Sequence, residues 1–140
     1  MSDPVNSLRF DVKIDGLDLG SFMAIDGLTA EYEVKTYQEG GENGFVHQLV
    51  GQVKYSDIRL GRPIDASSAT VAAWFFGFQA RPQRTTARIS ALAPDGSTIA
   101  AWRLEGVVPL SWTGPAFDVK DGGSVAREML ALRHEGFVLE

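Results

Sequence analysis

A pair of glutamates on one predicted strand is the first feature that could do chemistry. Glu31 and Glu33 are two residues apart, so a strand places both side chains on one face. Two neighbouring carboxylates are the groups that general acid–base catalysis uses. The same spacing is far more common on the solvent-exposed face of a strand. We therefore predict no acid–base site at these glutamates.

The two histidines are the next candidates. His47 lies in a predicted strand and His134 lies near the C-terminal end. Nothing in the sequence pairs either histidine with a nucleophile, and no Gly-x-Ser-x-Gly element is present. The chain has no cysteine, which excludes disulfides, thiolate zinc sites and cysteine nucleophiles. We predict no catalytic residue, no cofactor and no metal.

Two further clusters have the residue types of ion-binding sites. Asp11, Asp15 and Asp18 are crowded, but they lack the spacing and the closing glutamate of a calcium loop. Residues 40–44 are glycine-rich, yet no Gly-Lys-Ser/Thr follows, and neighbouring acids such as Glu39 would repel phosphate. We interpret the aspartates as turn-forming or solvated residues and the glycine-rich stretch as an exposed loop.

The composition fits one folded domain spanning residues 1–140. Hydrophobic residues make up 44% and charged residues 22%, which is ordinary for a globular protein. The net charge of −5 argues against nucleic-acid binding through a broad basic face. No apolar stretch reaches the ~18 residues that a membrane helix needs. The first residues lack the apolar segment of a signal peptide, so we expect cytoplasmic synthesis and no direct membrane insertion.

The charge is distributed unevenly along the chain. The first fifty residues hold nine acids and three bases, whereas the other ninety hold nine acids and ten bases. An acidic front and a near-neutral back could meet head to tail between copies. Two solvated faces explain the pattern equally well, and the sequence leaves both interpretations open.

Alternating apolar and polar residues predict a mainly β chain with antiparallel strands. Strands are expected over residues 8–14, 17–25, 30–37, 45–50, 53–60, 85–92 and 97–104. Asp15-Gly16 and Pro94-Asp95-Gly96 are turn signals, and Gly51 is expected to form a bulge or kink. Residues 61–63, 106–109 and 113–115 are expected to interrupt strands.

One helix is predicted, at about residues 67–80. Ser67 or Ser68 is expected to cap it by accepting a free backbone N–H, and Pro82 is expected to end it. Its apolar stripe, at i, i+3, i+4 and i+7, consists of Val71, Trp74, Phe75 and Phe78. This stripe is expected to cover one face of a sheet or one mouth of a barrel. Residues 124–133 also favour a helix by local propensity, with a possible serine cap and Gly136 placed to end it.

Several ordered motifs also carry a family resemblance over nearly the whole chain. They are Ile14-Asp15-Gly16, Glu31-Tyr32-Glu33, Glu39-Gly40-Gly41-Glu42-Asn43, Lys54-Tyr55, Trp112-Thr113-Gly114-Pro115 and His134-Glu135-Gly136-Phe137. This order resembles the tail tube proteins of contractile phages and of phage-tail-like contractile injection systems. Two segments depart from the family pattern: Leu49-Val50-Gly51 stands where Leu-Pro-Gly is frequent, and Leu60-Gly61-Arg62-Pro63 where Lys-Arg-Gly is frequent. The subgroup stays open among phage tail, phage-tail-like bacteriocin and extracellular injection particle.

The resemblance implies an antiparallel β-sandwich or barrel with one flanking helix. It also implies a structural, non-enzymatic role, in which hexameric rings stack into a hollow tube driven into a target by a contracting sheath. Implied partners are other copies, the sheath, baseplate and spike, a tube terminator, and a cargo protein or phage DNA in the lumen. Such a subunit is made in the bacterial cytoplasm and assembled into a phage tail or a released particle.

The resemblance changes one local prediction, because residues 125–134 would form a strand. Leu130 and Leu132 would then share a face with Glu128 and His134, opposite Met129 and Ala131. For the assembly, we expect the polar face of one strand to line the lumen, with Tyr32 and Val34 of the same strand in the core. The expected lumen residues are Glu31, Glu33 and Lys35. The expected ring-stacking loop is Gln38, Glu39, Gly40, Gly41, Glu42, Asn43 and Gly44.

Two alternatives remain open on the sequence. A subunit with the same fold could instead form a short initiator ring at the baseplate, or a ring at the tube end. A small non-catalytic, ligand-binding β-barrel is the alternative from a different class of protein.

Overall fold

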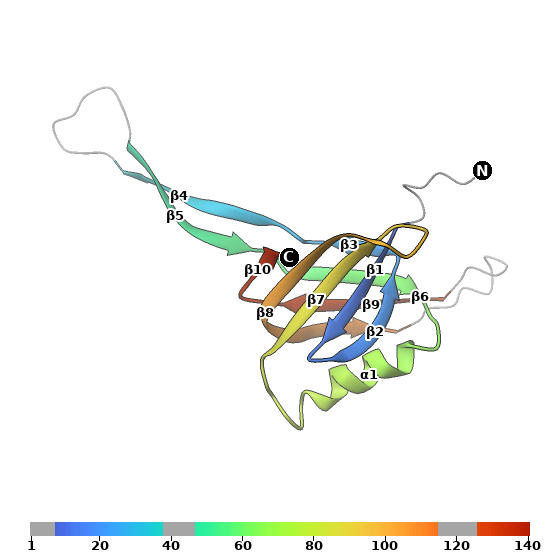
Figure 1. Ribbon diagram of the computed structural model, residues 1–140. Helices are drawn as coiled ribbons and strands as arrows, with labels where there is room; N and C mark the ends of the chain where they lie inside the picture. The colour runs from blue at the N-terminus through green and yellow to red at the C-terminus, as the bar shows by residue number, and fades with distance from the viewer. Residues whose placement is uncertain (1–7, 38–46, 115–125) are drawn as a thin grey trace, which may run out of the picture.

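The fold is mainly β, as predicted, in a computed structural model that describes residues 8–37, 47–114 and 126–140 (Figure 1). The strands before the helix are β1 (Arg9–Ile14), β2 (Leu17–Phe22), β3 (Ala24–Asp26), β4 (Ala30–Tyr37), β5 (His47–Tyr55) and β6 (Ile58–Pro63). The helix is α1 (Ser68–Gly77). The strands after it are β7 (Thr85–Leu92), β8 (Thr98–Thr113), β9 (Arg127–Arg133) and β10 (Gly136–Leu139).

The strand order follows one curved path that folds back on itself. Hydrogen bonds link the strands in the order β2-β1-β7-β8-β9-β6-β3, and every pairing is antiparallel. The short strand β10 pairs with β8 along the edge opposite β7. The long strand β8 joins the two halves. It pairs with β7 as far as Val107 and with β9 from Val108 onward. Gly106, at φ +64°, lies where β8 passes from one half to the other.

The core lies between the two halves and is built from alternate residues of their strands. Fully buried side chains come from β1, β7 and β8 on one side and from β6 and β9 on the other. They include Val12, Ile14, Ile89, Leu104, Ile58, Leu60, Leu130 and Leu132. Each large side chain of this kind contributes about 1.5–3 kcal/mol when it leaves water, so the two halves stabilise one another.

The segment with strong helix propensity is a strand. Residues 127–133 form β9, which hydrogen-bonds to β6 on one side and to β8 on the other. Glu128, Leu130 and Leu132 are buried, whereas Met129 is exposed. The helix predicted from local propensity is therefore wrong and the strand implied by the resemblance is confirmed. Two flanking strands and a period-two apolar face outweigh intrinsic preference here.

Two of the expected interruptions in the strands are misplaced, and one break falls where a continuous strand was expected. Residues 61–63 lie within β6, where Pro63 occupies the last position and needs no further ladder bond. Residues 106–109 lie within β8. The break between β5 and β6 falls at Ser56–Asp57. Gly51 does lie in a bulge, as predicted, because two residues of β5, Gln52 and Gly51, lie opposite the single residue Glu33 of β4.

The helix α1 is shorter than predicted and flanks the sandwich beside β2 and β8 (Figure 1). Val71 is buried, and Trp74 and Phe75 pack against the core. Ser67 occupies the N-cap position, but its side chain makes no capping hydrogen bond. The expected hydroxyl cap is therefore wrong. Instead, the Ser67 N–H donates to Asp65 Oδ1 (2.7 Å), and the Asp65 N–H donates to Ser68 Oγ (3.0 Å).

Candidate assembly surfaces

A two-stranded arm projects from the body of the molecule (Figure 1). The chain runs outward through β3 and β4 and returns through β5 and β6, so the four strands form two consecutive stretches of one antiparallel ribbon. The root of this ribbon is held in the sandwich because β6 pairs with β9. The outer stretch, β4–β5, is a separate two-stranded sheet. We call this outer stretch the arm.

One face of the arm is apolar and exposed. Tyr32 lies opposite Val53, and Val34 lies opposite Val50, so the four side chains share a face. The exposed fractions of Tyr32, Val34 and Val50 are 65%, 55% and 69%. The expectation that Tyr32 and Val34 lie in the core is wrong, because the arm extends beyond the body that would have covered them.

The other face of the arm carries the residues expected in the lumen. Glu31 lies opposite Lys54, and Lys35 lies opposite Leu49. Glu33 approaches Lys54, with Oε1 and Nζ 3.7 Å apart. The structure therefore brings Glu31, Glu33 and Lys35 together on one polar face, opposite Tyr32 and Val34. The expected stacking loop, Gln38 to Gly44, lies outside the described residues.

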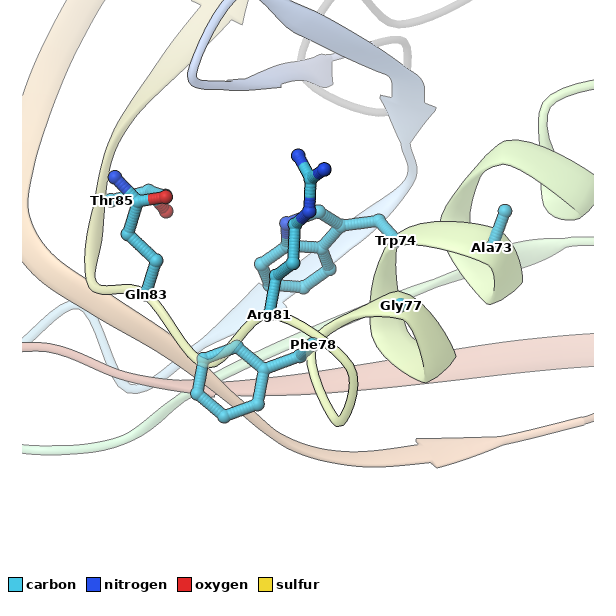
Figure 2. A pocket seen from close by; sticks show the side chains of 7 residues that line it. All are labelled: Ala73, Trp74, Gly77, Phe78, Arg81, Gln83 and Thr85. Atoms are coloured by element: carbon cyan, nitrogen blue, oxygen red, sulfur yellow. The ribbon is translucent and has the colours of Figure 1, made fainter.

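An open hollow lies at the C-terminal end of α1 (Figure 2). It encloses about 200 Å³ and is lined by Ala73, Trp74, Gly77, Phe78, Arg81, Gln83 and Thr85. Phe78, the last residue of the predicted stripe, lines this hollow rather than the core. Neither a carboxylate nor a histidine is among these lining side chains. The hollow thus offers no acid–base pair and no nucleophile with a base beside it.

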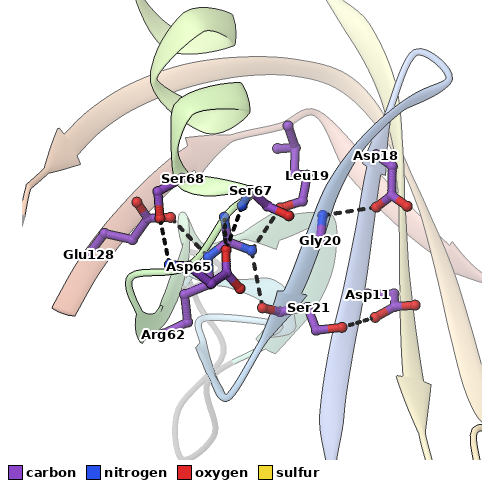
Figure 3. Close-up of polar contacts among 10 residues, drawn as sticks. All are labelled: Asp11, Asp18, Leu19, Gly20, Ser21, Arg62, Asp65, Ser67, Ser68 and Glu128. Atoms are coloured by element: carbon purple, nitrogen blue, oxygen red, sulfur yellow. Dashed lines mark hydrogen bonds and ion pairs between the residues drawn. The ribbon is translucent and has the colours of Figure 1, made fainter. Parts of the chain in front are cut away.

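A buried ion pair links β6 to β9 beside the edge of β2 (Figure 3). Arg62 and Glu128 are direct partners in the β6–β9 ladder, and both are 1% exposed. Arg62 Nε donates to Glu128 Oε1 (2.9 Å), and Arg62 Nη1 donates to the carbonyl oxygens of Leu19 (2.8 Å) and Ser21 (3.1 Å). The guanidinium also lies over the ring of Phe22, 4.3 Å from its centroid. Arg62 therefore satisfies backbone acceptors on an edge of β2 that pairs with no strand among the described residues.

The role of Arg62 was not predicted, because residues 61–63 were expected to interrupt a strand. The available signal was the position of Glu128 on the same face as Leu130 and Leu132. A carboxylate on a buried face requires a cation nearby, and an arginine on a neighbouring strand is the natural source.

The remaining candidates for chemistry lie apart. His134 is buried beside Ser56, whereas His47 begins β5 in the arm. Within the described ranges, no three His, Cys, Asp or Glu side chains are grouped so as to hold a metal ion. No helix in these ranges is both long enough and apolar enough to cross a membrane.

Solved structures with this fold come from contractile injection systems. A chain of the extracellular contractile injection system PVC sheath–tube complex, in the extended state, is 21% identical with a TM-score of 0.79, covering 99% of this chain and 91% of that one. A chain of the anti-feeding prophage baseplate is 24% identical with a TM-score of 0.74, covering 100% and 97%. Hcp1 from Flavobacterium johnsoniae is 8% identical with a TM-score of 0.52, covering 94% of each chain.

At these identities the likeness establishes the fold. No curated protein matches the chain significantly. The family model of the T4-like virus tail tube protein gp19 matches residues 6–138. The chain therefore belongs to the gp19 tail tube protein family and is a structural tube protein.

Proposed function

We propose that this chain is the repeating inner-tube subunit of a contractile injection particle, forming hexameric rings that stack into a hollow tube. The observation that carries this proposal is the arm with its exposed apolar face. A ring closes through one heterologous contact, and stacking through a second, open-ended contact yields a filament. A projecting arm is suited to such contacts because it reaches beyond its own subunit.

The energetics of the arm favour a second copy as its cover. A lone two-stranded ribbon is at best marginally stable in water, and this one exposes Tyr32, Val34 and Val50. Burial of each of these side chains against another copy would contribute about 1.5–3 kcal/mol. The apolar face is therefore assigned to the contact between subunits.

The polar face of the arm is then left for the lumen. Glu31, Glu33 and Lys35 lie opposite the apolar face, so they remain hydrated when that face is buried. A hydrated wall lets a cargo protein or DNA slide without adhering. The loop from Gln38 to Gly44 is assigned to the grip on the adjacent ring, since it follows directly from the arm strand β4.

The proposed partners follow from the assemblies in which similar chains occur. These are a sheath–tube complex, a sheath and tube terminator, a tube-terminating cap and a baseplate. We assign this chain a sheath, a baseplate with its spike, and a terminator, in a particle that acts outside the cell. The role is structural and not enzymatic.

Negative-stain electron microscopy of the purified chain tests the proposal. Stacked hollow tubes are the expected result. Single rings alone would favour an initiator or tube-end subunit, and a monomer that also fails to join native particles would refute the tube role.

Matched double variants then distinguish the roles of the two faces of the arm. Val34→Asp with Val50→Asp should abolish rings or stacks.

The matched variant on the other face is Glu33→Gln with Lys35→Gln, which should leave assembly intact. Loss of rings in this polar-face variant would instead place that face at a subunit contact. Deleting residues 40–43 should leave rings but stop stacking. Normal tubes from the deletion variant would refute the role assigned to the loop.

A further inference from the structure

The root of the arm is held by residues at the end of β9, at the start of β10 and in the short segment between them. The arm leaves the body at Ser56 and Asp57, which separate β5 from β6. The two residues that end β9 and follow it, Arg133 and His134, are more than seventy positions away in sequence. They nevertheless bind these two root residues directly.

His134 makes the buried part of this contact. Its side chain is 8% exposed, and Nε2 lies 3.0 Å from the carbonyl oxygen of Ser56. Because a carbonyl oxygen only accepts hydrogen bonds, Nε2 carries the hydrogen and donates it. Arg133 adds an exposed contact one residue further on, with its Nε donating to Asp57 Oδ1 at 3.3 Å.

An aromatic cluster extends the contact to the last residue of the arm. The ring of Tyr55 lies edge-on to His134 (centroids 5.5 Å apart) and to Phe137 in β10 (5.2 Å). Gly136 provides the room, because a Cβ there would come within 3.0 Å of Tyr55 Cε2. The last arm residue and the two root residues are thus all held: Tyr55 by Phe137 and His134, Ser56 by His134, and Asp57 by Arg133.

We propose that Arg133, His134 and Phe137 form a clamp that fixes the direction of the arm relative to the body. His134 and Arg133 are positioning residues: they act on assembly through the root and not by touching a second copy. This inference rests on the proposed function only for the advantage that a fixed arm gives to assembly. An arm that already points in one direction loses less conformational freedom when it docks.

Spin-label distance measurements test the clamp directly. The chain has no cysteine, so Lys35→Cys on the arm and Thr98→Cys on the body give two unique label sites. Labelled chain is diluted with unlabelled chain so that only distances within one copy are recorded. The otherwise unchanged chain should give one narrow distance distribution.

Four variants distinguish the effect of losing the His134 hydrogen bond from the effect of a general loss of stability. His134→Leu should lose the narrow distribution and the ability to form tubes. His134→Gln, which keeps a side-chain N–H donor, should restore both. Arg133→Gln changes an exposed side chain, so it should fold and broaden the distribution in part. Ile89→Val, which trims the core in β7, a strand that pairs with β1 and β8 and not with β5 or β6, should lower thermal stability without broadening the distribution.

Three outcomes would overturn the clamp. They are a broad distribution in the chain with an intact clamp, a narrow distribution in both His134→Leu and Arg133→Gln, and broadening in Ile89→Val equal to that in His134→Leu. A narrow distribution in a chain that never forms rings would contradict the proposed function while supporting the clamp.

Discussion

Arg62 and Glu128 show how one pair of side chains supports both the core and a strand edge. Removing Arg62 leaves the Glu128 carboxylate buried without a cation, and removing Glu128 leaves the buried guanidinium only the half-exposed Asp65, whose Oδ1 lies 3.8 Å from Nη2. Breaking a buried pair of this kind costs about 3–5 kcal/mol. We therefore expect Arg62→Met and Glu128→Leu each to lower the unfolding free energy by about that amount. Urea denaturation followed by circular dichroism measures the loss.

The double variant tests the second role of Arg62. Arg62→Met combined with Glu128→Leu leaves no unpaired charge, so it should be more stable than either single variant. It should still fall short of the parent by about 1–3 kcal/mol per carbonyl left unsatisfied, since Leu19 and Ser21 lose their shared donor. A double variant as stable as the parent would show that the edge contacts contribute nothing.

Asp95 is a residue with a clear acid–base consequence. The Ser97 hydroxyl donates to its Oδ1 at 2.6 Å and the Ser97 N–H at 2.9 Å. The side-chain bond and then the backbone bond hold the pKa of Asp95 below its ordinary value of 3.8. This carboxylate stabilises the turn above pH 3.8, and its contribution is lost as the pH falls through the lowered pKa.

The Ser97→Ala variant tests this assignment. It removes the hydroxyl donor, so the pKa of Asp95 should rise toward the ordinary value. Carbon-detected NMR titration of the Asp95 carboxyl follows the change. An unchanged titration curve would mean that the hydroxyl contributes nothing to the lowered pKa.

At the scale of elements, the junction between β3 and β4 depends on one glycine. Gly27 has φ +92°, and a Cβ there would lie 1.9 Å from the carbonyl oxygen of Asp57 at the arm root. Gly27→Ala should therefore displace the root and prevent tube formation, while the body of the protein still folds. Thermal unfolding and electron microscopy report the two effects separately.

Gly96→Ala is the matched control for that variant. Gly96 has nearly the same φ, +90°, but no atom lies within 4 Å of the added Cβ. It should cost only backbone strain of about 1–3 kcal/mol and leave assembly intact. Equal effects of the two substitutions would show that the contact with Asp57 is unimportant.

The elements also show what local sequence determines. Period-two alternation is sufficient to predict β1 and β7, because both lie within a sheet with one buried face. The same rule places Tyr32 and Val34 on one face of β4 and Glu31 and Glu33 on the other, as the register confirms. It cannot say what covers the apolar face, since that depends on whether the strand lies over its own core. For β9, propensity fails because two partner strands distant in sequence decide its conformation.

At the scale of the whole molecule, the uneven charge and the apolar arm predict opposite responses to salt. Raising the ionic strength from about 0.1 M to about 1 M shortens the Debye length from ~10 Å to ~3 Å. Head-to-tail contacts between the acidic front of one copy and the near-neutral back of another would weaken. Burial of Tyr32, Val34 and Val50 would not, so we expect tubes to persist at high salt. Sedimentation at both salt concentrations measures this, and dissolution would favour the electrostatic contact.

The continuity of β8 has a mechanical consequence for a subunit of this kind. Because a single strand belongs to both halves of the sandwich, a load applied to one half reaches the other through covalent backbone as well as through packed side chains. Separating the halves would require breaking all the hydrogen bonds of one ladder, either between β8 and β7 or between β8 and β9. If the chain forms the proposed tube, we therefore expect each body to resist compression and tension as one unit, with strain concentrated at the contacts between subunits.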